Sequence, residues 1–433
     1  MSAVATPVCE LPTAQKATKA CRVVVTGMGA VSPIGDSLET IWASIEQGRP
    51  GIKRMSAIAP GDTTCKVAGE IPDFDPEQYV EKKEARRMDR YMQFAAAAAK
   101  LAMAHSGARS HVPDDRLGVV VGSGAGGMIT IENTMRKAIE QGFHRISPFF
   151  VPMMLPDLGA GHVSILNNAK GPNRSVVTAC ATGSDSIGDA CRLIQEGRAD
   201  VMIAGGAEAP ITAIAVGGFT AARTLSNSDT PETASRPFDT ARDGFVIAEG
   251  AGVLILESLE HAQARGATIY AELVGYGSTS DANDIVAPCA DGDGAARAMI
   301  LALEDAGLAP EDIQYLNAHA TSTPVGDIAE ITAIKRVFGI HATSKQLAIS
   351  GTKSMHGHLL GGTGALEAII CILAMQNNTL PPTINLDSID PACAELDLVP
   401  NTSRKVENLH TVMSNSFGFG GHNACLIFKK FTA

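Results

Sequence analysis

The sequence predicts an α/β protein made of two similar halves, and three observations support this. Short apolar runs alternate with segments of helical periodicity along nearly the whole chain. The apolar runs are continuous, as in strands that are covered on both faces. With 433 residues, the chain exceeds the usual size of a single hydrophobic core, so two halves are expected.

The predicted strands are β-branched runs bounded by glycine or polar turns. In chain order they are 22–29, 117–122, 175–178, 201–205, 252–257, 270–275, 313–316, 347–350 and 425–429. Helical spacing is clearest in 90–104, 183–196, 295–305, 328–337 and 364–375. Residues 1–21 are expected to be a flexible tail. The segment 257–270 predicts a short helix, so the halves 22–268 and 269–433 should pack rigidly against each other.

Composition excludes several classes of protein. Hydrophobic residues make up 45% and charged residues 19%, as in a packed globule. The net charge of −11 argues against nucleic-acid binding. Nine cysteines without a CxxC pair indicate reduced thiols. We find no apolar run of about 18–20 residues and no secretory signal, so no membrane span and a cytoplasmic location are expected.

Cys180 is the first candidate for chemistry. It follows the predicted strand 175–178 and precedes Gly183, where helical spacing begins. The N-terminus of a helix favours a thiolate, and a sharp turn from strand to helix would expose the sulfur. A lone cysteine is more often structural, which is the better interpretation for Cys191, Cys371 and Cys425.

His319 and His358 strengthen the case for Cys180. Both lie in loops that follow predicted strands, and such loops gather at one end of an α/β sheet. A cysteine with two histidines fits a hydrolase, a metal site or a condensing site. No metal site is predicted, because neither histidine has partners at metal-ligand spacing and His356 has no carboxylate or cysteine nearby.

Four motifs make the pattern specific: TACATGS around Cys180, NAHATSTPVGD around His319, GTKSMHGHLLGGTGALE around His358 and SNSFGFGGHN near the C-terminus. In type and order they resemble the motifs of elongating β-ketoacyl-acyl-carrier-protein synthases, over roughly residues 22–430. The resemblance implies a thiolase-like fold, with two similar halves in stacked α-β-α-β-α layers, and a homodimer. It also implies decarboxylative condensation of an acyl thioester with malonyl-ACP to give 3-oxoacyl-ACP in fatty acid elongation.

The resemblance also assigns roles to residues. Cys180 resembles the acyl acceptor, His319 and His358 the pair that binds malonyl thioester, and Phe419 the gate that lends a backbone N–H. Lys353 aligns with the active-site lysine and Glu367 with its carboxylate partner. The remaining substrate-binding positions implied are Thr321, Thr323, Ala125, Phe150, Phe219 and Glu367.

The resemblance implies an acyl carrier protein as partner and no required cofactor. Phosphopantetheine arrives on the carrier, and a structural monovalent cation is compatible with the family. Acidic carriers would dock on positive charge. The candidate docking residues are Lys82, Lys83, Arg86, Arg87, Arg145 and Arg223.

Some positions depart from the family pattern. His356 and His422 stand where threonine is common, and Ala125 stands where isoleucine often forms the floor of the acyl pocket. A related ketosynthase of a specialised polyketide, polyene or lipid pathway therefore remains an alternative. A thiolase or Cys-His hydrolase is disfavoured because no second active cysteine precedes Cys425. A chain-length-factor partner is disfavoured because Cys180 is present.

Overall fold

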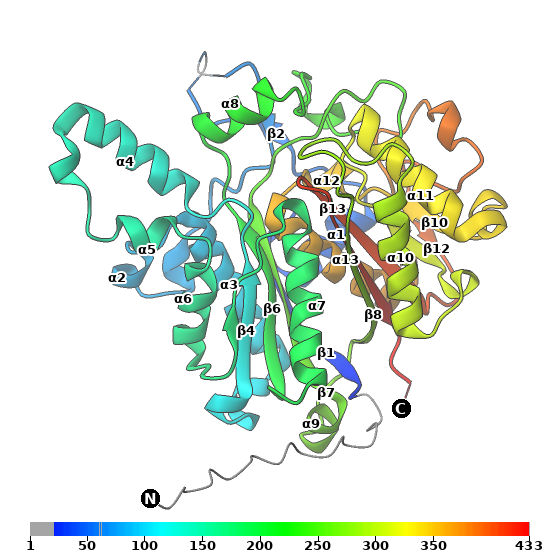
Figure 1. Ribbon diagram of the computed structural model, residues 1–433, viewed down its shortest axis with the longest axis horizontal. Helices are drawn as coiled ribbons and strands as arrows, with labels where there is room; N and C mark the ends of the chain where they lie inside the picture. Colours follow the sequence, from blue (N-terminus) through cyan, green and yellow to red (C-terminus); the bar gives the residue numbers. More distant parts are fainter. Residues whose placement is uncertain (1–20, 60, 62, 433) are drawn as a thin grey trace, which may run out of the picture.

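Figure 1 shows the computed structural model, which describes residues 21–432 except 60 and 62. Ten strands form one sheet in the order β10-β9-β13-β14-β8-β1-β7-β6-β4-β5. These strands are β1 (Val23–Val31), β4 (Leu117–Gly122), β5 (Asn173–Arg174), β6 (Val201–Glu208), β7 (Gly250–Ser258), β8 (Ala271–Ser280), β9 (Tyr315–Asn317), β10 (Ala348–Ser350), β13 (Thr411–Gly418) and β14 (His422–Lys429). Two short ribbons pair β2 (Lys53–Arg54) with β3 (Val67–Ala68), and β11 (Thr379–Leu380) with β12 (Arg404–Lys405).

The helices are α1 (Leu38–Glu46), α2 (Lys82–Ala85), α3 (Arg90–Ser106), α4 (Met128–Gln141), α5 (Phe150–Met154), α6 (Leu158–Asn167), α7 (Thr182–Gln195), α8 (Ala213–Ala221), α9 (Leu259–Ala264), α10 (Asp293–Ala306), α11 (Pro324–Thr343), α12 (Lys353–His356) and α13 (Thr363–Asn377). In Figure 1, α4 stands out from the body at the side of the molecule that carries α5 and α2.

The sheet contains the same arrangement of strands twice. In the five strands from β1 to β5 of this order, β4 lies parallel to β5 and β6, and β7 lies antiparallel to β6 and β1. In the other five, β9 lies parallel to β10 and β13, and β14 lies antiparallel to β13 and β8. The two sets join where β1 pairs with β8. The two halves therefore share one topology, as predicted.

Helices form three layers around these two sets of strands. The central helices α7 and α13 contact each other and strands of both sets. The outer helix α3 packs on β1, β6 and β7, while α10 packs on β8 and β14. This arrangement is the α-β-α-β-α stack that the sequence predicted. The segment 360–377 is long and apolar enough to cross a membrane by composition, but most of it is buried and it contains the central helix α13.

Most predicted elements are present, with one error at the nucleophile. The helix predicted in 257–270 is α9. Segment 175–178 is not a strand: β5 pairs with β4 only through Asn173 and Arg174. The chain then leaves the sheet, and it passes so close to Gly122 that a Cβ there would lie 2.4 Å from the Val176 carbonyl oxygen. The predicted tail, 1–21, lies outside the described residues except for Cys21.

Candidate active site

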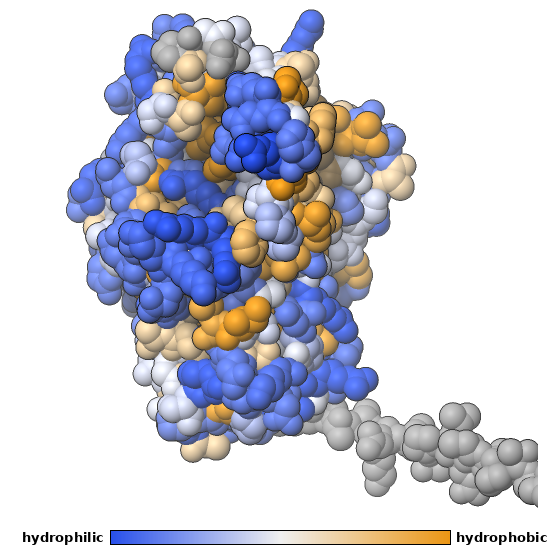
Figure 2. Space-filling model, turned by 90° about the vertical axis from the view of Figure 1, so that its left-hand side faces the viewer, coloured by the Kyte–Doolittle hydropathy of each residue, from blue (hydrophilic) through white to orange (hydrophobic). Residues whose placement is uncertain are grey.

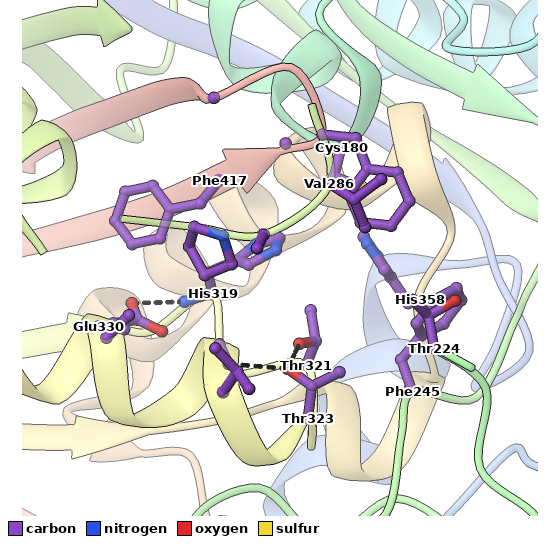
Figure 3. A pocket seen from close by; sticks show the side chains of 18 of the residues that line it. Cys180, Thr224, Phe245, Val286, His319, Thr321, Thr323, Glu330, His358 and Phe417 are labelled. Carbon is purple, nitrogen blue, oxygen red and sulfur yellow. Dashed lines mark hydrogen bonds between the residues drawn. The ribbon is translucent and has the colours of Figure 1, made fainter. Parts of the chain in front are cut away.

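A cavity of about 380 Å³ opens where the three predicted reactive loops meet. Cys180, His319 and His358 all line it, and Figure 3 shows them around one space. Its wall also includes the predicted residues Thr321, Thr323, Phe219, Arg223 and Phe419. The fold thus brings together side chains that are up to 239 positions apart in the sequence.

Cys180 lies in a tight turn ahead of α7. Ala179 has a φ of 49°, a backbone conformation that residues other than glycine rarely adopt. The β13 residue Gly418 packs directly against this turn, because a Cβ there would lie 2.6 Å from the Thr178 carbonyl oxygen. One 3-10 turn, Ala179–Ala181, then leads into the helix at Thr182. The sulfur therefore lies near the helix N-terminus, as predicted.

Opposing effects act on the pKa of the Cys180 thiol. Burial raises the pKa of the thiol to about 12, against the lowering effects of the Lys353 charge and the backbone N–H groups of Phe419 and Cys180. Desolvation of the anion therefore outweighs the helix N-terminus. The same two N–H groups that favour the anion are suitably placed to hold negative charge at this point of the cavity.

The two histidines face each other across the cavity. Their ring centroids are 5.4 Å apart and the rings are nearly perpendicular, at 84°. Burial lowers the pKa of both imidazoles well below the ordinary value, and the charge of Lys353 lowers it further. Both are therefore neutral at pH 7. His319 Nδ1 and His358 Nε2 are buried and have no hydrogen-bond partner within the described chain.

A buried carboxylate holds the loop of His319. The backbone N–H groups of His319 and Ala320 donate to Glu330 at 2.8 Å each, as Figure 3 shows for His319. Asn415 on β13 donates to the same carboxylate at 3.1 Å. Hydrogen bonds from N–H groups to a carboxylate are strong, so the loop is fixed from behind by the helix α11.

Lys353 and Glu367 lie behind the cavity instead of in its wall. They form an ion pair, with 2.7 Å between Lys353 Nζ and Glu367 Oε1, and their side chains are 1% and 0% exposed. Glu367 therefore does not reach the substrate space as predicted, because its carboxylate is held by the lysine. His356 is also buried, and hydrogen-bonds the Gly357 carbonyl and Thr352 instead of facing the cavity.

Two predicted pocket residues lie elsewhere in this chain. Ala125 is exposed, and its backbone N–H donates to Glu208. Phe150 lines a separate hollow with Asp89 and Met153. Neither residue is among those that line the cavity at Cys180.

The predicted docking residues fall into two groups. Arg223 lines the cavity and is exposed. The others are on α2, beside it, or in the turn before α5, where Lys82 pairs with Glu77 and Arg87 pairs with Glu84. Lys83, Arg86 and Arg145 are exposed as well.

Three important residues were not predicted from the sequence. Glu330 lies within the predicted helix 328–337 and in none of the four motifs. Glu208 closes the apolar strand β6, and a charge at that point was the available signal. It accepts hydrogen bonds from Ser123, Gly124, Ala125 and Gly361, which join the loop of β4 to the loop of His358. Thr363 hydrogen-bonds His358 Nδ1 at 2.9 Å.

Comparison with known proteins agrees with this geometry. Residues 20–262 match the beta-ketoacyl synthase N-terminal domain, and residues 270–387 match the C-terminal domain. The chain belongs to the beta-ketoacyl synthase family. Within this family it is 53% identical over 415 residues to 3-oxoacyl-[acyl-carrier-protein] synthase 2 of Staphylococcus aureus strain N315, covering 95% of this chain and 99% of the relative. The synthase of the same name from Synechocystis sp. is 49% identical over 412 residues, covering 95% and 98%.

Solved beta-ketoacyl synthases share the fold. One from Burkholderia phymatum is 39% identical with a TM-score of 0.87, covering 95% of this chain and all of that one. A type II polyketide ketosynthase, solved with its acyl-carrier protein and a bound hexaketide, is 33% identical with a TM-score of 0.88 over the same shares. The predicted resemblance and the thiolase-like fold are confirmed.

Proposed function

We propose that the chain is a 3-oxoacyl-[acyl-carrier-protein] synthase that elongates fatty acids by decarboxylative condensation. The observation that supports it most strongly is the shared cavity of Cys180, His319 and His358. The curated relatives that carry this name at about half identity over 95% of the chain support the same activity.

The first step transfers the acyl group. The Cys180 sulfur attacks the carbonyl carbon of acyl-ACP, a new C–S bond forms, and the phosphopantetheine thiol leaves with the proton of Cys180. Negative charge that develops on the carbonyl oxygen is held by the backbone N–H groups of Cys180 and Phe419, which also favour the thiolate.

The second step uses the histidines. Malonyl-ACP places its thioester oxygen between the His319 and His358 rings, which donate N–H bonds to it. The carboxylate leaves as carbon dioxide, and its bonding electrons pass into an enolate that the two donors stabilise. The enolate carbon attacks the acyl thioester on Cys180, so a C–C bond forms and the C–S bond breaks. 3-Oxoacyl-ACP is released, and the Cys180 thiolate takes a proton from solvent, which restores the thiol. Neutral imidazoles suit this task because they carry the N–H donors without a competing charge.

The cavity wall and the surface provide for the carrier protein. Thr321 and Thr323, which are hydrogen-bonded to each other, line the cavity where a pantetheine arm would lie, and Phe219 packs 6.1 Å from the Phe419 ring. Arg223 at the mouth would meet the phosphate of phosphopantetheine. A solved ketosynthase relative bound to its acyl-carrier protein supports this partnership.

A homodimer and a cytoplasmic location belong to the same proposal. The face formed by α4, α5 and their connection exposes large apolar side chains: Met135, Ile139, Phe143, Phe149 and Val151. Figure 2 shows this side of the molecule, where hydrophobic patches lie among hydrophilic ones. A second copy would cover these side chains, and would also cover Ala125, which a single chain leaves exposed.

No organic cofactor enters the proposed cycle. A structural monovalent cation, which the family resemblance allows, stays a prediction.

The Cys180→Ser variant tests the proposal. Incubation of the unmodified protein with acyl-ACP should add one acyl mass to the peptide that contains Cys180, and the variant should carry none. Decarboxylation of malonyl-ACP should persist in the variant because both histidines remain. An acyl mass on Cys191 or Cys289 would contradict the assignment.

The polyketide alternative is the weaker one. The ishigamide ketosynthase/chain length factor is 34% identical with a TM-score of 0.89, covering 96% of this chain and all of that one. The 53% identity to a 3-oxoacyl-[acyl-carrier-protein] synthase 2 favours primary elongation.

A further inference from the structure

Thr363 is the first residue of α13 and lies directly behind the ring of His358. Its Oγ1 is 2.9 Å from His358 Nδ1, and the two side chains belong to residues that are 1% and 2% exposed. Water therefore does not replace this contact. On the other side of the ring, Nε2 is buried and lacks a hydrogen-bond partner within the described chain, while the residue lines the cavity.

The contact between Thr363 and His358 determines which nitrogen of the His358 ring carries the proton. Within the described residues the Thr363 hydroxyl has no other hydrogen-bond partner. If Nδ1 carried the proton and donated it to Oγ1, the hydroxyl hydrogen would be buried without an acceptor, which costs about 1–3 kcal/mol. If the hydroxyl donates to Nδ1, every polar hydrogen behind the ring is satisfied. Nδ1 then has no proton, and the neutral ring carries its proton on Nε2.

The backbone around His358 supports the same orientation. The His358 backbone N–H donates to the Val246 carbonyl at 2.7 Å, which fixes the residue to the opposite segment. The ring of Phe245 packs edge-on against it, with 5.3 Å between centroids and an angle of 79°. The residue is therefore held at its backbone N–H, and its ring by Phe245 and at Nδ1, so that Nε2 is left to face the cavity.

By contrast, no side chain within the described residues sets the tautomer of His319. Glu330 accepts from its backbone and not from its ring, and His319 Nδ1 has no partner. The two histidines are therefore not equivalent: His358 has a fixed proton position, and His319 can exchange its proton between nitrogens.

We propose that Thr363 is a positioning residue that fixes the tautomer of His358, so that Nε2–H is always presented to the malonyl thioester oxygen. The inference rests on the proposed function, since it assigns the reason why one histidine of the pair is a dependable donor. It places Thr363 among the residues that determine the rate of decarboxylation, although Thr363 touches neither substrate nor nucleophile.

Three variants of the full-length protein test it. Thr363→Val keeps the shape and removes the hydroxyl, Thr363→Ser keeps the hydroxyl, and Thr379→Val is the matched control. Thr379 is also a buried threonine, lies just beyond the other end of α13, and donates to the Asn377 carbonyl at 2.9 Å. Two rates are measured for each variant: carbon dioxide release from malonyl-ACP and acylation of Cys180 by acyl-ACP.

We expect Thr363→Val to lower carbon dioxide release by about 10–10²-fold, by analogy with the loss seen when a metal-bound histidine loses the partner of its second nitrogen. Acylation of Cys180 should stay within about twofold, because Cys180 does not use His358 in that step. Thr363→Ser should restore most of the lost rate, and Thr379→Val should leave the ratio of the two rates unchanged.

Each other outcome overturns the inference. Equal losses in both rates for Thr363→Val would mean a general packing defect, and a serine variant as slow as the valine variant would exclude the hydroxyl. An unchanged rate of decarboxylation in Thr363→Val would show that the tautomer is set without Thr363. These results differ from failure of the proposed function, in which the unmodified protein itself would release no carbon dioxide or take no acyl group on Cys180.

Discussion

The buried pair of Lys353 and Glu367 allows a prediction whose size follows from the structure. Both side chains are almost fully buried and are joined at 2.7 Å. Burial raises the pKa of Glu367 above its ordinary value, and the charge of Lys353 opposes this effect. In Lys353→Met the opposing charge is gone, so the pKa of Glu367 rises further and the carboxyl stays protonated in the folded protein through neutral pH.

The raised pKa of Glu367 determines how the unfolding free energy of Lys353→Met changes with pH. A carboxyl whose folded pKa lies above its unfolded pKa keeps its full contribution to stability below the unfolded pKa, and loses it as pH rises. The unfolded value for Glu367 is 4.5. Each pH unit above it should cost Lys353→Met about 1.4 kcal/mol of unfolding free energy, or about 3.4 kcal/mol at pH 7.

The measurement is urea unfolding of Lys353→Met and of Lys353→Met/Glu367→Gln between pH 5 and pH 7.5. The double variant has the same cavity but no titrating carboxyl. The buried histidines contribute equally to both variants, so they cancel in the difference. We expect the two free energies to agree within about 1 kcal/mol at pH 5 and to separate by about 3 kcal/mol at pH 7. Parallel curves across this range would refute the reasoning, because Glu367 would then be ionised in the folded single variant.

Two further predictions concern the site and the carrier protein. His358→Ala should lower carbon dioxide release by about 10²–10³-fold and spare acylation of Cys180. His356→Thr should change either rate by less than about threefold, because His356 does not face the cavity. Similar losses for both variants in a decarboxylation assay would show that both histidines act. Arg223→Ala should raise KM for acyl-ACP severalfold and leave kcat unchanged, and the effect on KM should fade at high salt. Lys82→Ala should do little, because Lys82 already pairs with Glu77. A salt-independent loss of kcat in steady-state kinetics would exclude a docking role for Arg223.

The sequence predicted those parts of the fold that depend on periodicity. Strand β4 has the predicted bounds, and α3 begins at the predicted residue Arg90, because continuous apolar runs and helical spacing are properties of the chain itself. Strand β13 was missed. Its sequence, TVMSNSFG, is rich in small and polar residues although six of its eight positions are buried. Burial by α13 and β14 overrides the weak local preference there.

The sequence predicted that Cys180, His319 and His358 share one site, because their loops follow strands and their motifs are specific. It could not supply the contacts behind them. These contacts depend on side-chain directions in three dimensions. They include the ion pair of Glu367 with Lys353, the contact of Thr363 with the His358 ring and the position of Ala125 outside the cavity. The effect of desolvation on the pKa of Cys180 could not be predicted for a related reason, since it depends on everything packed around the sulfur and not on the helix alone.

The three reactive loops share a structural device that explains how the site keeps its geometry. Each contains a residue other than glycine with positive φ next to or near the reactive side chain: Ala179 at 49°, Ala320 at 36° and Leu360 at 45°. Such conformations cost about 1–3 kcal/mol each and persist only where the surroundings enforce them. At two of the loops a buried carboxylate does so, because Glu330 binds the N–H of Ala320 and Glu208 binds the N–H of Gly361, next to Leu360. Strong hydrogen bonds to charged oxygens offset the backbone strain, so the histidines are oriented before any substrate arrives.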